Sequence, residues 1–216
     1  MVELDGPRLK PASGEASGLV VLLHGYGADG SDLIGLAEVW APHLPQLAFV
    51  APNAPDPCEL ASIGRQWLPL TLRDPSEYWR GVTAAMPVLD RFLDAELART
   101  GLSERELVLV GFSQGTMMAL HVGLRRPNPL AGLIGYSGAL AGPERLAEDP
   151  RHRFPLMLVH GAADDVLPAE LTDQAAQTLS GLGVPVTSHI EPGLGHGISE
   201  TGLRLGADFL SKVLPE

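Results

Sequence analysis

The chain has 216 residues, 45% of them hydrophobic, and its 26 acidic and 15 basic residues give a net charge of −11 at pH 7. This length suits one folded domain, residues 1–216, and the negative charge argues against nucleic acid or an anionic membrane as a partner. The single cysteine, Cys58, excludes an intrachain disulfide and fits a reducing compartment. The N-terminus carries neither a basic segment nor a long apolar one, so we expect a cytoplasmic protein without stable membrane association.

Short apolar runs alternate along the chain with segments of helical spacing. Five of these runs are apolar throughout, as expected of parallel strands covered on both faces, and the last one alternates more. The expected strands are Leu19–Leu23, Ala48–Ala51, Leu107–Val110, Leu130–Tyr136, Leu156–His160 and Val184–Ile190. The expected helices are Ser31–Trp40 with a Ser cap, Ser76–Arg99 with a kink or break at Pro87, Gln114–Arg125, Ala169–Leu179 and Gly202–Val213. This alternation predicts an α/β fold with a doubly wound, mostly parallel sheet.

A glycine-rich loop, His24-Gly25-Tyr26-Gly27, follows the first expected strand. It is a variant of the HGGG-type loop that supplies a backbone N–H to an oxyanion hole, so we expect Tyr26 to donate that N–H and His24 to brace the loop. The stretch from Gly25 to Gly30 is also a formal G-x-G-x-x-G, which is typical of a dinucleotide-binding oxidoreductase. That alternative needs an acidic residue at the end of the next strand, where Ala51-Pro52-Asn53 stands instead.

The connection Pro52–Asp74, called the flap below, is irregular and rich in proline. Long loops that carry large apolar side chains are usually packed flaps or binding walls. The large apolar residues here are Leu60, Ile63, Trp67, Leu68, Leu70 and Leu72.

The segment Gly111-Phe112-Ser113-Gln114-Gly115 lies between an expected strand and an expected helix. In that context G-x-S-x-G is the nucleophile-elbow pattern, in which a strained turn presents the serine hydroxyl and the two glycines avoid a collision. Ser113 is therefore the predicted nucleophile, and the amide of Gln114 is the predicted second oxyanion donor. Such a serine needs a base to remove its proton and a carboxylate to orient that base.

The acid and the base are expected on loops that follow later strands. Asp164 and Asp165 come just after the strand that ends at His160, and from the residues alone either one could orient the base. His196 lies in the glycine-hinged loop 193–197, between the last strand and the last helix, and is the predicted base. The other downstream histidines suit packing or surface roles; they are His121, His152, His160 and His189.

Four motifs occur in a fixed order: Leu22-Leu23-His24-Gly25-Tyr26-Gly27, the elbow, His160-Gly161-x-x-Asp164-x-Val166-x-Pro168 and Gly195-His196. With them the chain, from Leu19 to Phe209, resembles the phospholipase/carboxylesterase family of α/β-hydrolases, small serine esterases without a cap domain that are related to acyl-protein thioesterases. The resemblance implies an α/β-hydrolase fold, Asp164 as the acid, carboxylic esters as small-molecule substrates, no cofactor and, in members near this size, frequently a homodimer.

The resemblance also implies substrate-binding residues. Trp67 and Leu68 resemble a Trp-aromatic pair in the family's flap, although the second residue here is Leu, and Val166 matches a pocket-lining residue. Trp67 and Val166 suit plain packing equally well. The short Ser137–Phe154 connection leaves no room for a cap.

We therefore predict a serine carboxylesterase that hydrolyses short-chain esters through a Ser-His-Asp triad and an acyl-enzyme. The alternatives are an acyl-thioesterase or lysophospholipase with the same triad, and a non-catalytic ligand-binding relative. No metal is expected, because no His/Cys cluster has zinc spacing and the acidic stretch from Asp29 has Trp40 where an EF-hand needs Glu.

Overall fold

The computed structural model describes residues 3–59, 63–70, 76–148 and 152–214. Within these ranges the main sheet has seven strands in the order β1-β3-β2-β6-β7-β8-β9. The β1–β3 pair is antiparallel, and every other neighbouring pair in this sheet is parallel, as predicted. The strands are β1 (Arg8–Leu9), β2 (Gly18–Leu23), β3 (Leu47–Val50), β6 (Leu107–Phe112), β7 (Gly132–Tyr136), β8 (Leu156–Gly161) and β9 (Val186–Glu191).

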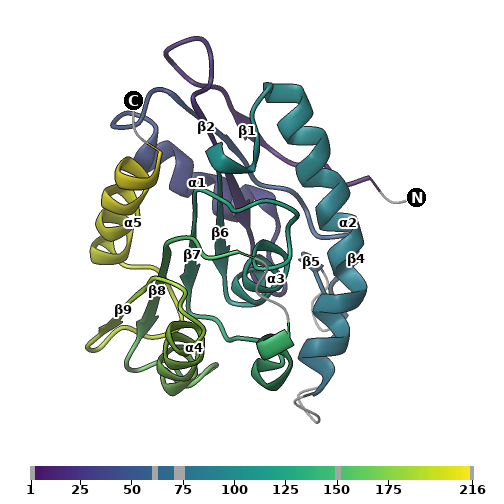
Figure 1. The fold of residues 1–216 in the computed structure, drawn as a ribbon, viewed down its shortest axis with the longest axis vertical. Coiled ribbons are helices and arrows are strands. Elements are labelled where there is room, and N and C mark those ends of the chain that lie inside the picture. The colour runs from purple at the N-terminus through teal and green to yellow at the C-terminus, as the bar shows by residue number, and fades with distance from the viewer. Residues whose placement is uncertain (1–2, 60–62, 71–75, 149–151, 215–216) are drawn as a thin grey trace.

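Helices cover both faces of this sheet, which confirms the doubly wound arrangement. α1 (Gly30–Trp40) and α5 (Glu200–Val213) pack on one face, and α2 (Ser76–Thr100), α3 (Gln114–Gly123) and α4 (Glu170–Gly181) pack on the other. Figure 1 shows the sheet between α5 and α2. The smaller elements are the β4 (Asp56–Pro57) and β5 (Arg65–Gln66) pair and the 3₁₀ helices η1 (Glu104–Glu106) and η2 (Pro143–Glu148).

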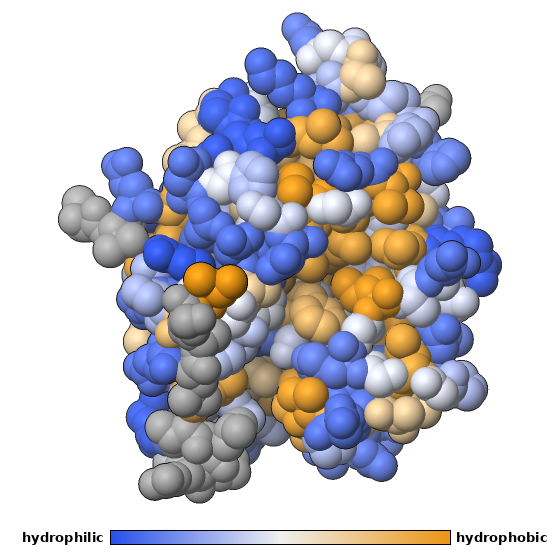
Figure 2. Space-filling view, turned by 180° about the vertical axis from the view of Figure 1, so that it is seen from behind, coloured by the Kyte–Doolittle hydropathy of each residue, from blue (hydrophilic) through white to orange (hydrophobic). Residues whose placement is uncertain are grey.

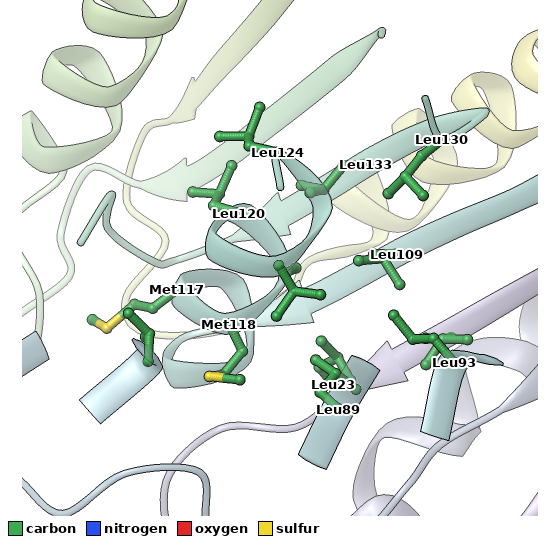
Figure 3. Packing of buried hydrophobic residues seen from close by; sticks show 14 of the residues in the cluster. Leu23, Leu89, Leu93, Leu109, Met117, Met118, Leu120, Leu124, Leu130 and Leu133 are labelled. Carbon is green, nitrogen blue, oxygen red and sulfur yellow. The ribbon is translucent and has the colours of Figure 1, made fainter. Parts of the chain in front are cut away.

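Alternate residues of each central strand point to opposite faces of the sheet. In β2, Leu19 and Val21 join the core beneath α2, α3 and α4, whereas Val20 and Leu22 join the core beneath α1 and α5. Burial on both faces explains why these runs are apolar throughout. Figure 3 shows that the side chains of α3 contribute to the first of these cores, beside residues of α2 and the strands. The helix after the elbow is buried along its whole length, so it forms a rigid support.

Two details of the helices differ from the predictions. The cap of α1 is Asp29 and not Ser31. The Asp29 carboxylate accepts the Ser31 N–H at 2.7 Å, and the Asp32 carboxylate accepts the Asp29 N–H at 3.2 Å. The predicted split at Pro87 is wrong, because α2 continues through it. A proline inside a helix costs about 3 kcal/mol, but Pro87 lies on the exposed side, where water can solvate the freed carbonyl.

A buried carboxylate joins the edge strand β1 to α2. Glu96 has a side chain only 4% exposed, and its two oxygens lie 2.7 Å from Arg8 Nη2 and 2.5 Å from Arg99 Nη2. Burial by itself would raise the pKa of Glu96, but the hydrogen bonds and charges of the two arginines outweigh it and lower this pKa below its ordinary value of 4.5. The ionised form is therefore the one that stabilises the fold.

The Glu96→Gln variant is expected to lower the free energy of unfolding at pH 7 by about 3 kcal/mol, because it removes one partner of a buried ion pair. Since the pKa of Glu96 is lower in the folded state than in the unfolded one, its stabilisation is complete above the unfolded value and is lost as pH falls through the folded value. Denaturant unfolding between pH 7 and pH 3 should thus show a weaker pH dependence for Glu96→Gln than for the wild type. The exposed Glu38→Gln is the matched control, and equal stability of the two variants at pH 7 would contradict this prediction.

Hydrophobic side chains also reach the surface. Seen from behind, they form an area surrounded by hydrophilic residues (Figure 2). In the described ranges the exposed large hydrophobic residues are Val39 in α1, Ile63 in the flap and Val166 in the loop after β8. No helix of these ranges is long and apolar enough to cross a bilayer. Two of the three exposed residues therefore belong to loops that the sequence assigns to the candidate site.

Candidate active site

Ser113 occupies a strained turn between β6 and α3. Its φ of +54° and ψ of −116° lie in a region that L-residues rarely adopt, at a cost of about 1–3 kcal/mol. A Cβ on Gly115 would lie 1.9 Å from Leu23 O, and one on Gly111 would lie 2.4 Å from Thr116 N. The expectation that both glycines must lack a side chain is therefore confirmed. The turn is held by the Ser113 N–H, which donates to Tyr136 O at 2.9 Å.

The two neighbouring aspartates have different surroundings. The Asp164 side chain is fully buried, and its Oδ1 accepts the N–H groups of Val166 and Leu167 at 2.8 and 2.9 Å. Its other oxygen, Oδ2, lies 2.7 Å from His196 Nδ1. Asp165 is exposed and makes no such contact with His196. Of the two candidates left open by the residues, the structure thus brings Asp164 to the histidine.

The hydrogen bonds of Asp164 keep it ionised. Burial would raise its pKa, but the Leu167 N–H, the His196 ring and the Val166 N–H together outweigh burial and lower the pKa below its ordinary value. A carboxylate in this state can hold the Nδ1 proton of an imidazole and stabilise the charged ring.

His196 lies beside the elbow. Its ring centroid is 5.0 Å from that of Phe112, the residue before Ser113, and the next residue of its loop, Gly197, accepts a hydrogen bond from Ser137 Oγ at 3.4 Å. Within the described residues no hydrogen bond joins Ser113 Oγ to the imidazole. Such bonds are often long without substrate and tighten only in the complex.

His160 braces the loop that carries Asp164, which agrees with its predicted structural role. The ring is fully buried, with Nδ1 at 2.8 Å from Thr172 Oγ1 and Nε2 at 2.9 Å from Leu167 O. Its Nε2 also lies 3.0 Å from Asp164 Oδ2. The His160 side chain therefore connects the end of β8, Asp164 and the start of α4. The sequence did not indicate this connection.

The loop of Tyr26 runs alongside the elbow, because a Cβ on Gly25 would lie 3.3 Å from Ser113 Cβ. His24 braces this loop as predicted: it is fully buried, its Nδ1 donates to Gly25 O at 2.7 Å, and its Nε2 accepts the Ala54 N–H at 2.9 Å. Burial lowers the pKa of His24, which favours the neutral ring that these contacts require. The loop that carries the Tyr26 backbone is thus held against the elbow at Gly25.

The glycines of the formal G-x-G-x-x-G have structural explanations within this loop. Gly27 has a φ of +79°, and a Cβ on Gly30 would lie 2.0 Å from Ala51 O. The Gly30 N–H donates to Asn53 Oδ1 at 2.9 Å, at the position where a dinucleotide site would need an acid. The pattern is therefore explained without a nucleotide.

The Gln114 side chain ties the flap to the elbow helix. Its Oε1 accepts the N–H groups of Trp67 and Leu68 at 2.6 and 3.4 Å, and its Nε2 donates to Leu68 O at 2.8 Å. The Trp67 indole N–H donates to His24 O at 3.0 Å. The sequence predicted a role only for the Gln114 backbone and gave no signal for this second role of its side chain, which is buried and therefore needs hydrogen-bond partners.

The predicted substrate-binding residues lie at different depths. Trp67 and Leu68 are buried, and Trp67 also lines a cavity of about 400 Å³ between the flap and α2. Leu68 packs against Gly81, where a Cβ would approach it to 2.6 Å. Val166 is exposed on the loop of Asp164. The flap residues Leu60 and Leu72 lie outside the described residues.

Comparison with known proteins finds relatives that match nearly the whole chain. The family model described as phospholipase/carboxylesterase matches residues 4–214. Acyl-protein thioesterase 1 of Gibberella zeae is 27% identical, with 97% of this chain and 96% of that protein covered. Esterase YpfH of Escherichia coli is 26% identical, with coverages of 93% and 85%. The crystal structure of esterase PE8 is 45% identical, with a TM-score of 0.96 and coverages of 99% and 100%.

Proposed function

Because the chain belongs to the phospholipase/carboxylesterase family and is an esterase or thioesterase of the serine-hydrolase type, we propose that it hydrolyses short-chain carboxylic esters with Ser113 as nucleophile, His196 as base and Asp164 as orienting acid. The observation that carries this proposal is the 2.7 Å contact between His196 Nδ1 and the buried Asp164 carboxylate, next to the strained turn of Ser113. Removal of the Ser113 hydroxyl tests it most directly, because turnover must then be lost while the protein still folds.

In the proposed mechanism Ser113 Oγ attacks the ester carbonyl while His196 Nε2 takes its proton. Asp164 keeps the Nδ1 proton in place, so that the Nε2 lone pair faces the serine. The backbone N–H groups of Tyr26 and Gln114 stabilise the oxyanion of the tetrahedral intermediate. His196 then protonates the leaving alcohol, which frees it from the acyl-enzyme.

The second half of the reaction uses the same groups. His196 removes a proton from water, the resulting hydroxide attacks the acyl-enzyme, and the proton returns to Ser113 Oγ as the carboxylic acid leaves. The lowered pKa of Asp164 supports this role, since the carboxylate is ionised throughout the neutral pH range. Every proton is transferred by residues of this chain.

Short acyl chains are the expected substrates. The described residues between β7 and β8 form only the 3₁₀ helix η2, and the flap residues Trp67 and Leu68 are buried against the elbow helix and α2. We therefore expect kcat/KM for p-nitrophenyl esters to be highest for acetate or butyrate and to fall by about tenfold or more for dodecanoate, because the longer chain gains no enclosed apolar wall. Rates across the acyl series, measured below the solubility limit of each ester, test this. A maximum at long chains without any effect of detergent would contradict it.

A thioesterase activity is the second candidate, favoured by the similarity to acyl-protein thioesterase 1. The proposed triad does not distinguish an oxygen leaving group from a sulfur one, so the geometry allows both reactions. The discriminating measurement compares kcat/KM for an ester and a thioester with the same acyl group and matched leaving groups. A clear preference for the thioester would move the assignment to this second class.

A further inference from the structure

A second strained residue lies next to the nucleophile. Among the described residues that are not glycine, only Ser113 and Ser137 have a positive φ, +54° and +45°. Phe112 and Tyr136 are partners in the β6–β7 register, so the two strained serines follow neighbouring strands at the same edge of the sheet. Ser137 is also buried. Strain of this kind persists only where the surroundings hold it, and it gathers at functional sites.

The pair Tyr136–Ser137 contacts the elbow through its backbone. Tyr136 O accepts the Ser113 N–H at 2.9 Å and the Thr116 hydroxyl at 2.8 Å. On its other side, the Ser137 N–H donates to Val159 O of β8 at 2.8 Å. The pair is therefore anchored to the strands that carry the nucleophile and the acid.

The side chains of the same two residues reach the segment that carries His196. Ser137 Oγ donates to Gly197 O at 3.4 Å, and Tyr136 Oη donates to Gly202 O, in the first turns of α5, at 2.9 Å. The Ala163 N–H donates to Leu194 O at 2.8 Å before His196, and Ser199 Oγ donates to Glu191 after it. At Gly197 itself an added Cβ would have no atom within 4 Å, so among the described residues the Ser137 hydroxyl is the contact to the backbone next to His196. Asp164 orients the ring from one side, and Ser137 restrains the backbone beside it.

We propose that Ser137, assisted by the Tyr136 hydroxyl, is a positioning residue that sets the separation between Ser113 Oγ and His196 Nε2. The inference rests on the proposed roles of Ser113 and His196. The bond to Gly197 is too long to contribute much stability. Its effect is on geometry, because a displacement of about 1 Å between reacting groups can cost about 10²-fold in rate.

Ser137→Ala and Ser137→Gly both remove the hydroxyl, but only the glycine relieves the backbone strain. We expect both variants to lower kcat for p-nitrophenyl butyrate by about tenfold to 10²-fold, with KM and melting temperature close to the wild-type values. The rate constant for labelling of Ser113 by a fluorophosphonate should fall by the same factor, since the same base serves that reaction. Ser211→Ala removes an exposed hydroxyl that, among the described residues, donates to Asp208 O in its own helix; it is the matched control and should leave all values unchanged.

Wild-type kcat in both Ser137 variants would overturn the proposal, as would a loss of rate that only follows the unfolded fraction. Full activity of Ser137→Gly beside a defective Ser137→Ala would also overturn it, because the hydroxyl would then be dispensable for positioning His196. If neither variant folds, Tyr136→Phe is decisive: it must lower kcat at unchanged KM, and a wild-type kcat would reject the proposal. Wild-type turnover and its loss in Ser113→Ala, measured in the same assay, test the proposed function separately.

Discussion

Ser113→Ala is expected to reduce kcat for p-nitrophenyl butyrate by about 10⁶-fold, because no other group can form the acyl-enzyme. The alanine keeps the Cβ of serine at the same strained φ of +54°, so the variant should fold with unchanged stability. Initial rates with purified protein give the activity, and thermal unfolding gives the stability. The loss is then attributable to the missing hydroxyl and not to the fold.

Two comparisons make the result specific to this serine. Ser211→Ala removes an exposed hydroxyl and should retain wild-type turnover, and a fluorophosphonate should label the wild type and this control but not Ser113→Ala. His196→Ala should be nearly as inactive, since the residues of such a site act as a unit. Turnover of Ser113→Ala within tenfold of wild type would leave the proposed nucleophile without support.

Asp164→Asn should lower kcat by about 10⁴-fold, by analogy with the loss measured when the acid of other triads is replaced by its amide. The amide cannot hold the Nδ1 proton as an anion does, so the imidazole takes the wrong tautomer for accepting the serine proton. The adjacent Asp165→Asn changes the net charge by the same amount but lies at an exposed position without contact to His196. It should change kcat by less than about twofold, within the range of ordinary surface substitutions.

Comparing the two aspartate variants therefore distinguishes the loss of His196 orientation from the loss of one negative charge. Both are measured with one ester at saturating concentration, at neutral pH and with the folded fraction monitored by circular dichroism. If Asp165→Asn were the more damaging change, the assignment of the acid to Asp164 would be wrong. Equal, small losses in both variants would show that His196 works without an orienting carboxylate.

Much of the fold was predictable because its determinants are local. Runs such as Leu19–Leu23 are apolar on both faces and end at turn residues, so the central parallel strands and the helices between them were expected within a few residues of their observed bounds. Pro87 misled the prediction for α2, since a sequence does not show that its ring faces solvent. The edge strand β1 and the β4–β5 pair were missed, because two-residue strands carry no periodicity and exist only through pairing with partners.

The features of the candidate site also divide into those that the local sequence pattern predicted and those that only the structure showed. A strained elbow and a loop crowded against it demand glycines at fixed spacings, so Ser113, Gln114 and the loop of Tyr26 could be proposed as site residues from the chain itself. The residues alone left Asp164 and Asp165 open, and only the resemblance favoured Asp164. The structure shows the physical difference, since adjacent residues of one loop point in different directions once that loop packs against His160 and the Leu167 N–H. Only the tertiary structure showed that Ser137 contacts Gly197, 60 residues away, and that the Gln114 side chain holds the flap. Hydrogen bonds between segments distant in the chain leave no trace in local pattern, because nothing but the packing of the whole sheet decides which residues meet.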